Sequence, residues 1–164
     1  MKSLVLLFVS FAAVLSSWGQ QARPSNAATP PKKPVSPFAD YAGEWTATFD
    51  SKVWLRLKLQ LEGEKLAGSL VHARNINVDD NGDVKSISED QVTETIADAV
   101  VNPDGLLITL KDSDTQETDS YMMKLVRPAK DAADLKLIGQ AMPPGMPKPK
   151  PWRVTKAGVS TTAP

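Results

Sequence analysis

The chain has 164 residues, with 19 basic side chains, 19 acidic side chains and one histidine, and it contains no cysteine. This length fits one domain with flanking segments, and the balanced charge gives no field that would attract a nucleic acid, so no nucleic-acid partner is expected. Without cysteine the chain forms no disulfide and no thiolate site, and the single histidine, His72, excludes a multi-histidine metal site.

Residues 1–19 have the pattern of a secretory signal peptide. Lys2 is their only charged side chain, an apolar run follows from Leu4 to Leu15, and Ser17 and Gly19 occupy the positions that a signal peptidase reads. A membrane anchor is the alternative, but an apolar run of about twelve residues spans only about 18 Å as a helix, less than the bilayer core of about 30 Å. We therefore expect an extracytoplasmic protein, periplasmic or secreted, that is not an integral membrane protein after cleavage of the signal.

Prolines mark the boundaries of the domain. Residues 20–37 hold five of the 13 prolines and are predicted to be a disordered linker. Five more lie between Pro143 and Pro151 and predict an extended loop that leads into a last short element at 152–156. Residues 158–164 are small and polar and are predicted to be a disordered tail. The domain is therefore expected over residues 38–157.

Alternation of apolar and polar residues predicts strands in the first half of this domain. From Val53 to Leu61 every second residue is apolar, the period-two pattern of a half-buried strand. The segment 45–49 alternates in the same way, and a turn at 50–51 joins the two. A second turn at 62–64 leads into a third strand over 65–74. Strands joined by such short turns pair in antiparallel fashion.

The second half predicts strands at 93–101, 106–111, 120–126 and 135–141, separated by segments with Gly, Pro, Asn or Asp. Residues 89–101 also fit a helix, because Ser88 begins a sequence like a capping box and apolar residues follow at helical spacing. The strand is favoured because β-branched residues are frequent there and an Asn-Pro-Asp-Gly turn comes next.

These elements predict an all-β fold of eight or nine strands. Strands adjacent in sequence are expected to be adjacent in space, which gives an antiparallel up-and-down meander. Closure into an 8–9-stranded barrel is the simplest arrangement, since it removes the exposed edges of the sheet. A β-sandwich with one helix, at 89–101, is the alternative.

The first and last strands resemble those of the calycins, the group that contains the lipocalins and the avidin-like barrels. Residues Asp40–Trp45 open the first strand with a Gly-x-Trp sequence, and Pro151–Val154 place an arginine in the last element. The resemblance covers about residues 41–156 and implies a barrel closed at one end by Trp45 packed beneath Arg153. It also implies that Gly43 lets the backbone approach closely there. The domain is similar as well to small secreted β-barrel proteins of bacteria.

The leading functional prediction is a non-enzymatic barrel that binds a small, apolar molecule in its interior. The expected cavity lining is the inward apolar set Leu55, Leu57, Leu59, Leu70, Leu106, Ile108 and Met123. No motif marks a catalytic residue, so neither an enzymatic activity nor a cofactor is expected, and His72 is interpreted as a hydrogen-bonded structural residue. An enzyme would depend on His72 or on a pair of carboxylates.

The alternative function is a protein-interaction or structural module of the cell envelope, with a packed core and no ligand. Trp54 interrupts the polar face of its strand, so Trp54 and Arg56 would form the surface that contacts an extracytoplasmic protein, unless Trp54 packs beneath a loop or the N-terminal linker.

The acidic segment 77–83 raises the question of a metal site. Asp79, Asn81 and Asp83 are weak calcium candidates, because oxygen ligands at alternate positions begin an EF-hand loop. Neither frame of the loop supplies both the glycine and the acidic ligand that such a loop needs. A polar hairpin turn is therefore favoured, and no metal is expected.

Overall fold

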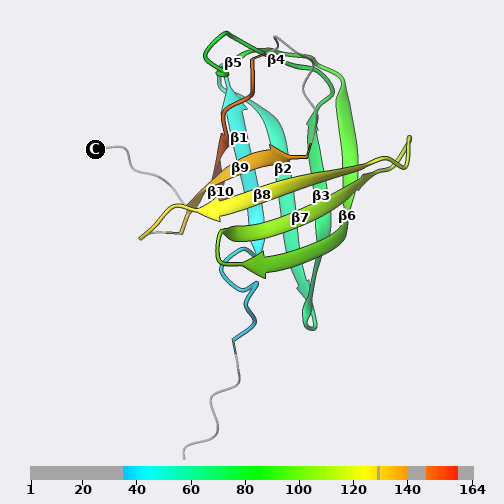
Figure 1. Cartoon of the computed structure of the whole chain (residues 1–164), viewed down its shortest axis with the longest axis vertical. Helices are drawn as coiled ribbons and strands as arrows, with labels where there is room; N and C mark the ends of the chain where they lie inside the picture. The colour runs from blue at the N-terminus through cyan, green and yellow to red at the C-terminus, as the bar shows by residue number, and fades with distance from the viewer. Residues whose placement is uncertain (1–34, 129, 140–146, 159–164) are drawn as a thin grey trace, which may run out of the picture. The chain divides into compact units, whose positions relative to one another are not determined.

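The computed structural model describes residues 35–128, 130–139 and 147–158, and Figure 1 shows how they are arranged. The predicted signal peptide, most of the predicted linker and residues 159–164 of the tail lie outside the described residues. The described residues contain no helix that is long and apolar enough to cross a bilayer.

These residues form ten strands: β1 (Gly43–Phe49), β2 (Lys52–Glu62), β3 (Lys65–Ala73), β4 (Ile76–Val78), β5 (Val84–Ile87), β6 (Gln91–Asn102), β7 (Gly105–Asp112), β8 (Thr118–Leu125), β9 (Ala132–Ile138) and β10 (Trp152–Lys156). Eight of them close into an antiparallel barrel in the order β1-β10-β9-β8-β7-β6-β3-β2, and β4 pairs with β5 in a separate hairpin. The predicted up-and-down barrel is confirmed. Residues 91–102 are a strand, so the helix there and the sandwich built on it are wrong.

The core fills the barrel as the period of the strands requires. Inward residues alternate with outward ones, and the largest fully buried side chains are Trp45, Leu55, Leu57, Leu59, Leu70, Leu106, Ile108, Leu110, Met123, Leu135 and Val154. The first hairpin follows its predicted turn, since Asp50 and Ser51 both have a positive φ, 47° and 65°, as a two-residue type I′ turn needs.

Trp54 departs from the predicted alternation. Ala47 pairs with Leu55 and Thr48 pairs with Val53, so Trp54 is the extra residue of a β-bulge in β2. The bulge turns the Trp54 side chain inward, where it is only 4% exposed. It turns Val53 outward, to 42% exposure, although regular alternation places Val53 inside. The expectation that Trp54 lies on the outer face beside Arg56 is therefore corrected.

One end of the barrel is closed around Trp45. Its side chain is fully buried, and its Nε1 donates a hydrogen bond of 2.8 Å to the carbonyl of Tyr41. The cation above its ring is Lys156, whose Nζ lies 5.2 Å from the ring centroid. Arg153, expected there, points outward because Trp152 and Val154 occupy the inward positions of β10, and its Nε donates to Asp134 at 2.7 Å.

Gly43 makes room for this cation. A Cβ atom at Gly43 would lie 2.5 Å from Cε of Lys156, and the residue has a φ of +134°. The close approach expected at Gly43 therefore occurs, and it is made by the lysine side chain.

The β4–β5 hairpin lies at the opposite end of the barrel, the upper end in Figure 1. Its turn contacts the segment that leads into β10: the backbone N–H of Lys150 donates to the carbonyl of Gly82 at 2.9 Å. The Lys150 Nζ donates to Asp83 at 2.7 Å. This end therefore has a cover made of two segments that lie far apart in the sequence.

Candidate functional site

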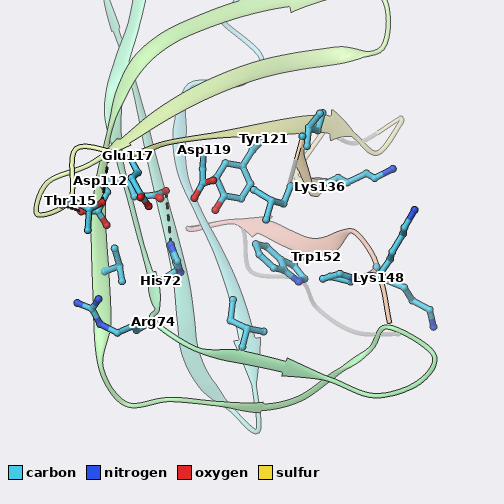
Figure 2. Close-up of a pocket in the computed structure, with 18 residues that line it drawn as sticks. His72, Arg74, Asp112, Thr115, Glu117, Asp119, Tyr121, Lys136, Lys148 and Trp152 are labelled. Atoms are coloured by element: carbon cyan, nitrogen blue, oxygen red, sulfur yellow. Dashed lines mark hydrogen bonds and ion pairs between the residues drawn. The ribbon is translucent and has the colours of Figure 1, made fainter. Parts of the chain in front are cut away.

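A cavity of about 700 Å³ lies at the end of the barrel beside the β4–β5 hairpin. Its wall is built from the ends of β3, β7 and β9 and from the beginnings of β6, β8 and β10, because successive strands run in opposite directions. Ile76 of β4 and the segment Lys148–Lys150 also line it. Figure 2 shows Tyr121 and Trp152 among the side chains in this pocket.

His72 and Glu94 form a buried pair on the wall of this cavity. His72 pairs with Val92 and Leu70 pairs with Glu94 in the β3–β6 ladder, so His72 and Glu94 share the inner face. The Nε2 of His72 lies 3.9 Å from Oε2 of Glu94, and the two side chains are 13% and 4% exposed. A dashed line in Figure 2 marks this ion pair.

The proton positions in this pair follow from the second ring nitrogen. Nδ1 of His72 lies 2.8 Å from the carbonyl of Ala73, and a carbonyl only accepts, so Nδ1 carries a hydrogen and donates it. In neutral His72, Nε2 is then an acceptor that faces an acceptor of Glu94. The pair is favourable only when one more proton lies on His72 or Glu94, or when a donor enters between them.

Two aromatic rings lie beside this pair. Tyr121 and Trp152 are 2% and 9% exposed, and their ring centroids are 6.3 Å apart. Trp54, turned inward by the bulge, meets Trp152 edge to face with centroids 5.1 Å apart. The bulge therefore supports the site by fixing the Trp152 ring.

Three buried polar atoms of this site have no hydrogen-bond partner among the described residues: Nε2 of His72, Oε2 of Glu94 and Nε1 of Trp152. Buried polar atoms are nearly always hydrogen-bonded, and each orphan costs about 1–3 kcal/mol. All three belong to residues that line the cavity. The wall of the cavity therefore holds an unpaired donor on Trp152 and unpaired acceptors on Glu94 and neutral His72, all on atoms that are themselves buried.

The electrostatics of the site follow from burial and from its carboxylates. Burial lowers the pKa of His72, but Glu94, the Ala73 carbonyl and Asp119 together outweigh it, and the net pKa is raised above its ordinary value. Burial, with Glu94 and Asp119 adding to it, raises the pKa of Tyr121 far above its ordinary value, so its hydroxyl stays protonated.

Charges at the cavity differ from one side to the other. Asp112, Glu117 and Asp119 lie on one side of the pocket in Figure 2, with Arg74 below them, and Lys136 and Lys148 lie on the other. Backbone N–H groups of Thr115 and Asp114 lower the pKa of Asp112, which keeps this carboxylate charged. The side formed by β7 and β8 is therefore acidic.

The seven apolar residues predicted to line a cavity lie in the core: Leu55, Leu57, Leu59, Leu70, Leu106, Ile108 and Met123 are each at most 1% exposed. None of them lines the cavity at the barrel end. That they contact a ligand stays a prediction. The site residues that the sequence analysis missed are Glu94, Tyr121 and Trp152. Glu94 interrupts the apolar alternation of Val92 and Ile96, but the same segment also fitted a helix, so this signal did not fix the inward position of Glu94.

The remaining predicted residues are not brought together as a site. Arg56 pairs with Glu44 at 3.0 Å, on the face opposite to Trp54. Oδ1 of Asp79 accepts the backbone N–H groups of Asn81 and Asp83, which makes the β4–β5 hairpin turn. Across the described ranges, no group of three or more histidine or acidic side chains could hold a metal ion.

Comparison with known proteins adds no relative, because no family model, no curated protein and no solved structure matches the chain. The closed, eight-stranded antiparallel barrel is consistent with a calycin-like fold.

Proposed function

We propose that this protein is a non-enzymatic binding protein that holds a small molecule in the cavity at the β4–β5 end of the barrel. The observation that carries the proposal is the set of three orphan polar atoms, on His72, Glu94 and Trp152, in residues lining one cavity. Their unmade hydrogen bonds favour an occupant. A volume of about 700 Å³ lies within the usual range of small-molecule sites.

The lining supports a ligand of mixed character, which modifies the apolar ligand expected from the sequence. Apolar contacts are available from Val92, Leu137 and Ile138. Polar groups come from His72, Glu94 and Trp152 of the same wall, whose three orphan atoms are buried and lack partners. We infer that an apolar or ring-shaped part lies against the aliphatic wall while a polar group faces His72 and Glu94.

We also propose that binding takes place outside the cytoplasm. This rests on the signal-peptide pattern of residues 1–19.

The test is native mass spectrometry of the chain purified from its own cells, compared with its denatured mass. We expect an excess of roughly a few hundred daltons, the size of molecule that such a cavity holds. Val92→Trp places a bulky ring in the cavity and should remove the excess. Val100→Trp adds the same ring at a position 48% exposed and away from the cavity, and should retain it.

Other masses would contradict the proposal. An excess of about 40 Da would indicate calcium and return attention to Asp79, Asn81 and Asp83. A bare mass, with no thermal stabilisation by any compound of a small-molecule library, would favour a structural or interaction module. That module would need a surface other than Trp54, because Trp54 is buried.

A further inference from the structure

We propose that the ligand carries a primary ammonium group, held between Glu94 and His72, together with an acceptor oxygen that faces Trp152. This inference rests on the proposed function, because it names the chemical class of the molecule in the same cavity. It is carried by the positions and the hydrogen-bonding roles of the three orphan atoms.

The gap between the two acceptors fits one nitrogen atom. Oε2 of Glu94 and Nε2 of His72 are 3.9 Å apart, too far for a direct hydrogen bond. A nitrogen about 2.9 Å from each atom bridges that distance once the two side chains, whose facing atoms are buried, open toward the cavity. An ammonium group has three hydrogens and no lone pair, so it donates to both. A ligand carboxylate has no hydrogen to give there, and a hydroxyl has one.

The charge of Glu94 also favours a cation. This side chain is only 4% exposed, and a buried carboxylate is costly unless it is paired. Without a ligand, a proton on His72 would supply the pairing charge, and the pKa of His72 is raised in the direction that favours it. When an ammonium group enters, His72 releases its Nε2 proton to solvent and accepts a hydrogen bond from the ligand. The ligand and this proton therefore compete for one position.

The third orphan atom specifies the other end of the ligand. Nε1 of Trp152 is a donor only, so an acceptor oxygen must face it. A hydroxyl, carbonyl or carboxylate oxygen on the same molecule would serve.

The other ionisable groups at the cavity come from every surrounding element. They are Arg74 after β3, Asp112 of β7, Glu117 before β8, Asp119 and Tyr121 of β8, Lys136 of β9, and Lys148 and Lys150 before β10. Asp119 reinforces Glu94 at His72, since both raise its pKa. The basic side chains Arg74, Lys136, Lys148 and Lys150 are exposed at the rim, where solvent screens them.

The experiment uses three probes with one carbon skeleton: phenylalaninol, 3-phenylpropan-1-ol and 3-phenylpropanoate, each at about 1 mM so that weak binding is detected. His72 is the only histidine, so its Cε1–H resonance reports this site without ambiguity. We expect phenylalaninol to bind at least about tenfold more tightly than the other two, because only its ammonium pairs with Glu94. We also expect it to lower the pKa of His72 and to bind more tightly as the pH rises.

Variants separate Glu94 from the other carboxylates. Glu94→Gln should weaken phenylalaninol binding by about 10- to 100-fold, the effect of a lost hydrogen bond to a charged group. Glu62→Gln removes an exposed carboxylate that does not line the cavity and should leave binding unchanged. The amide spectrum of each variant shows whether it is folded, and the wild-type His72 titration gives a result without any variant.

Several results would overturn the inference. Binding of the alcohol or the carboxylate as tight as that of the amine would refute the ammonium while leaving the cavity a ligand site. Binding of the amine with no change in the His72 titration would place it elsewhere. If none of the three probes binds, the ammonium is refuted, and the mass measurement then decides the proposed function independently.

Discussion

The bulge in β2 can be tested by a pair of neighbouring substitutions, Trp54→Ala and Val53→Ala. Regular alternation through Leu55, Leu57 and Leu59 places Val53 in the core and Trp54 outside, and the structure places them the other way round. The two arrangements therefore predict opposite orders of stability.

The size of the effect follows from burial. Trp54 is 4% exposed, and a tryptophan buries about 200 Å², which at about 25 cal/mol per Å² corresponds to about 5 kcal/mol. Large-to-small changes of aromatic core residues cost about 3–5 kcal/mol, and loss of the edge-to-face contact with Trp152 is part of that cost. We expect Trp54→Ala to lower the free energy of unfolding by about 3–5 kcal/mol. We expect Val53→Ala to lower the free energy of unfolding by under about 1 kcal/mol, because Val53 is 42% exposed.

The assay is urea unfolding followed by circular dichroism, with the midpoint and the slope fitted for each variant. A loss of about 3–5 kcal/mol is a large part of the roughly 5–15 kcal/mol that stabilises a domain, so the shift in midpoint is readily measured. If Val53→Ala costs as much as Trp54→Ala, or if Trp54→Ala costs under about 1 kcal/mol, the bulge is not where we place it.

Three further predictions concern the two ends of the barrel. Gly43→Ala should destabilise the fold by about 1–3 kcal/mol in urea unfolding, because the φ of +134° strains a residue with a Cβ and the end of the Lys156 side chain would have to move; a neutral result would contradict this. Lys156→Gln should lower the free energy of unfolding by about 0.5–2 kcal/mol, because the contact with Trp45 is lost. Arg153→Gln breaks an exposed ion pair and should lower it by under about 1 kcal/mol. The reverse order would indicate that Arg153 is the cation that closes this end. The raised pKa of His72 means that its contribution to stability is complete below its ordinary pKa of 6.5 and is lost as the pH rises through the folded-state pKa. Unfolding at a series of pH values should show this decline, and Glu94→Gln should flatten it; an unchanged decline in that variant would assign it to another group.

The barrel was predictable because its causes are local. A period of two along each strand and turn-forming residues between strands determine which segments pair, as at Asp50-Ser51. The same alternation indicates that Lys156, and not Arg153, lies over Trp45. Trp152, Val154 and Lys156 share one face of β10, and Arg153 lies on the other. The bulge at Trp54 had no such signal, because it depends on pairing with β1.

The cavity was not predictable for a related reason. Glu94 and His72 meet only through the register of β3 with β6, two strands separated by the β4–β5 insertion. No local pattern sets the register of strands that a tight turn does not join. Glu94 also lies in the segment that fitted a helix as well as a strand, so its inward position could not be derived.

Each end of the barrel contains a tryptophan with ionisable side chains beside it, but the hydrogen bonding of these groups differs between the two ends. At the closed end, Nε1 of Trp45 donates to Tyr41, and Nζ of Lys156 lies over the ring and donates to the Asp40 carbonyl at 3.4 Å. At the other end, Nε1 of Trp152 and the facing atoms of His72 and Glu94 lack partners. The first arrangement closes the barrel with its polar groups satisfied, as a structural role requires. The second leaves several kcal/mol of hydrogen bonding unmade beside an open volume, and a bound molecule would recover that energy. This difference is why we propose binding at the β4–β5 end and structural closure at the Trp45 end.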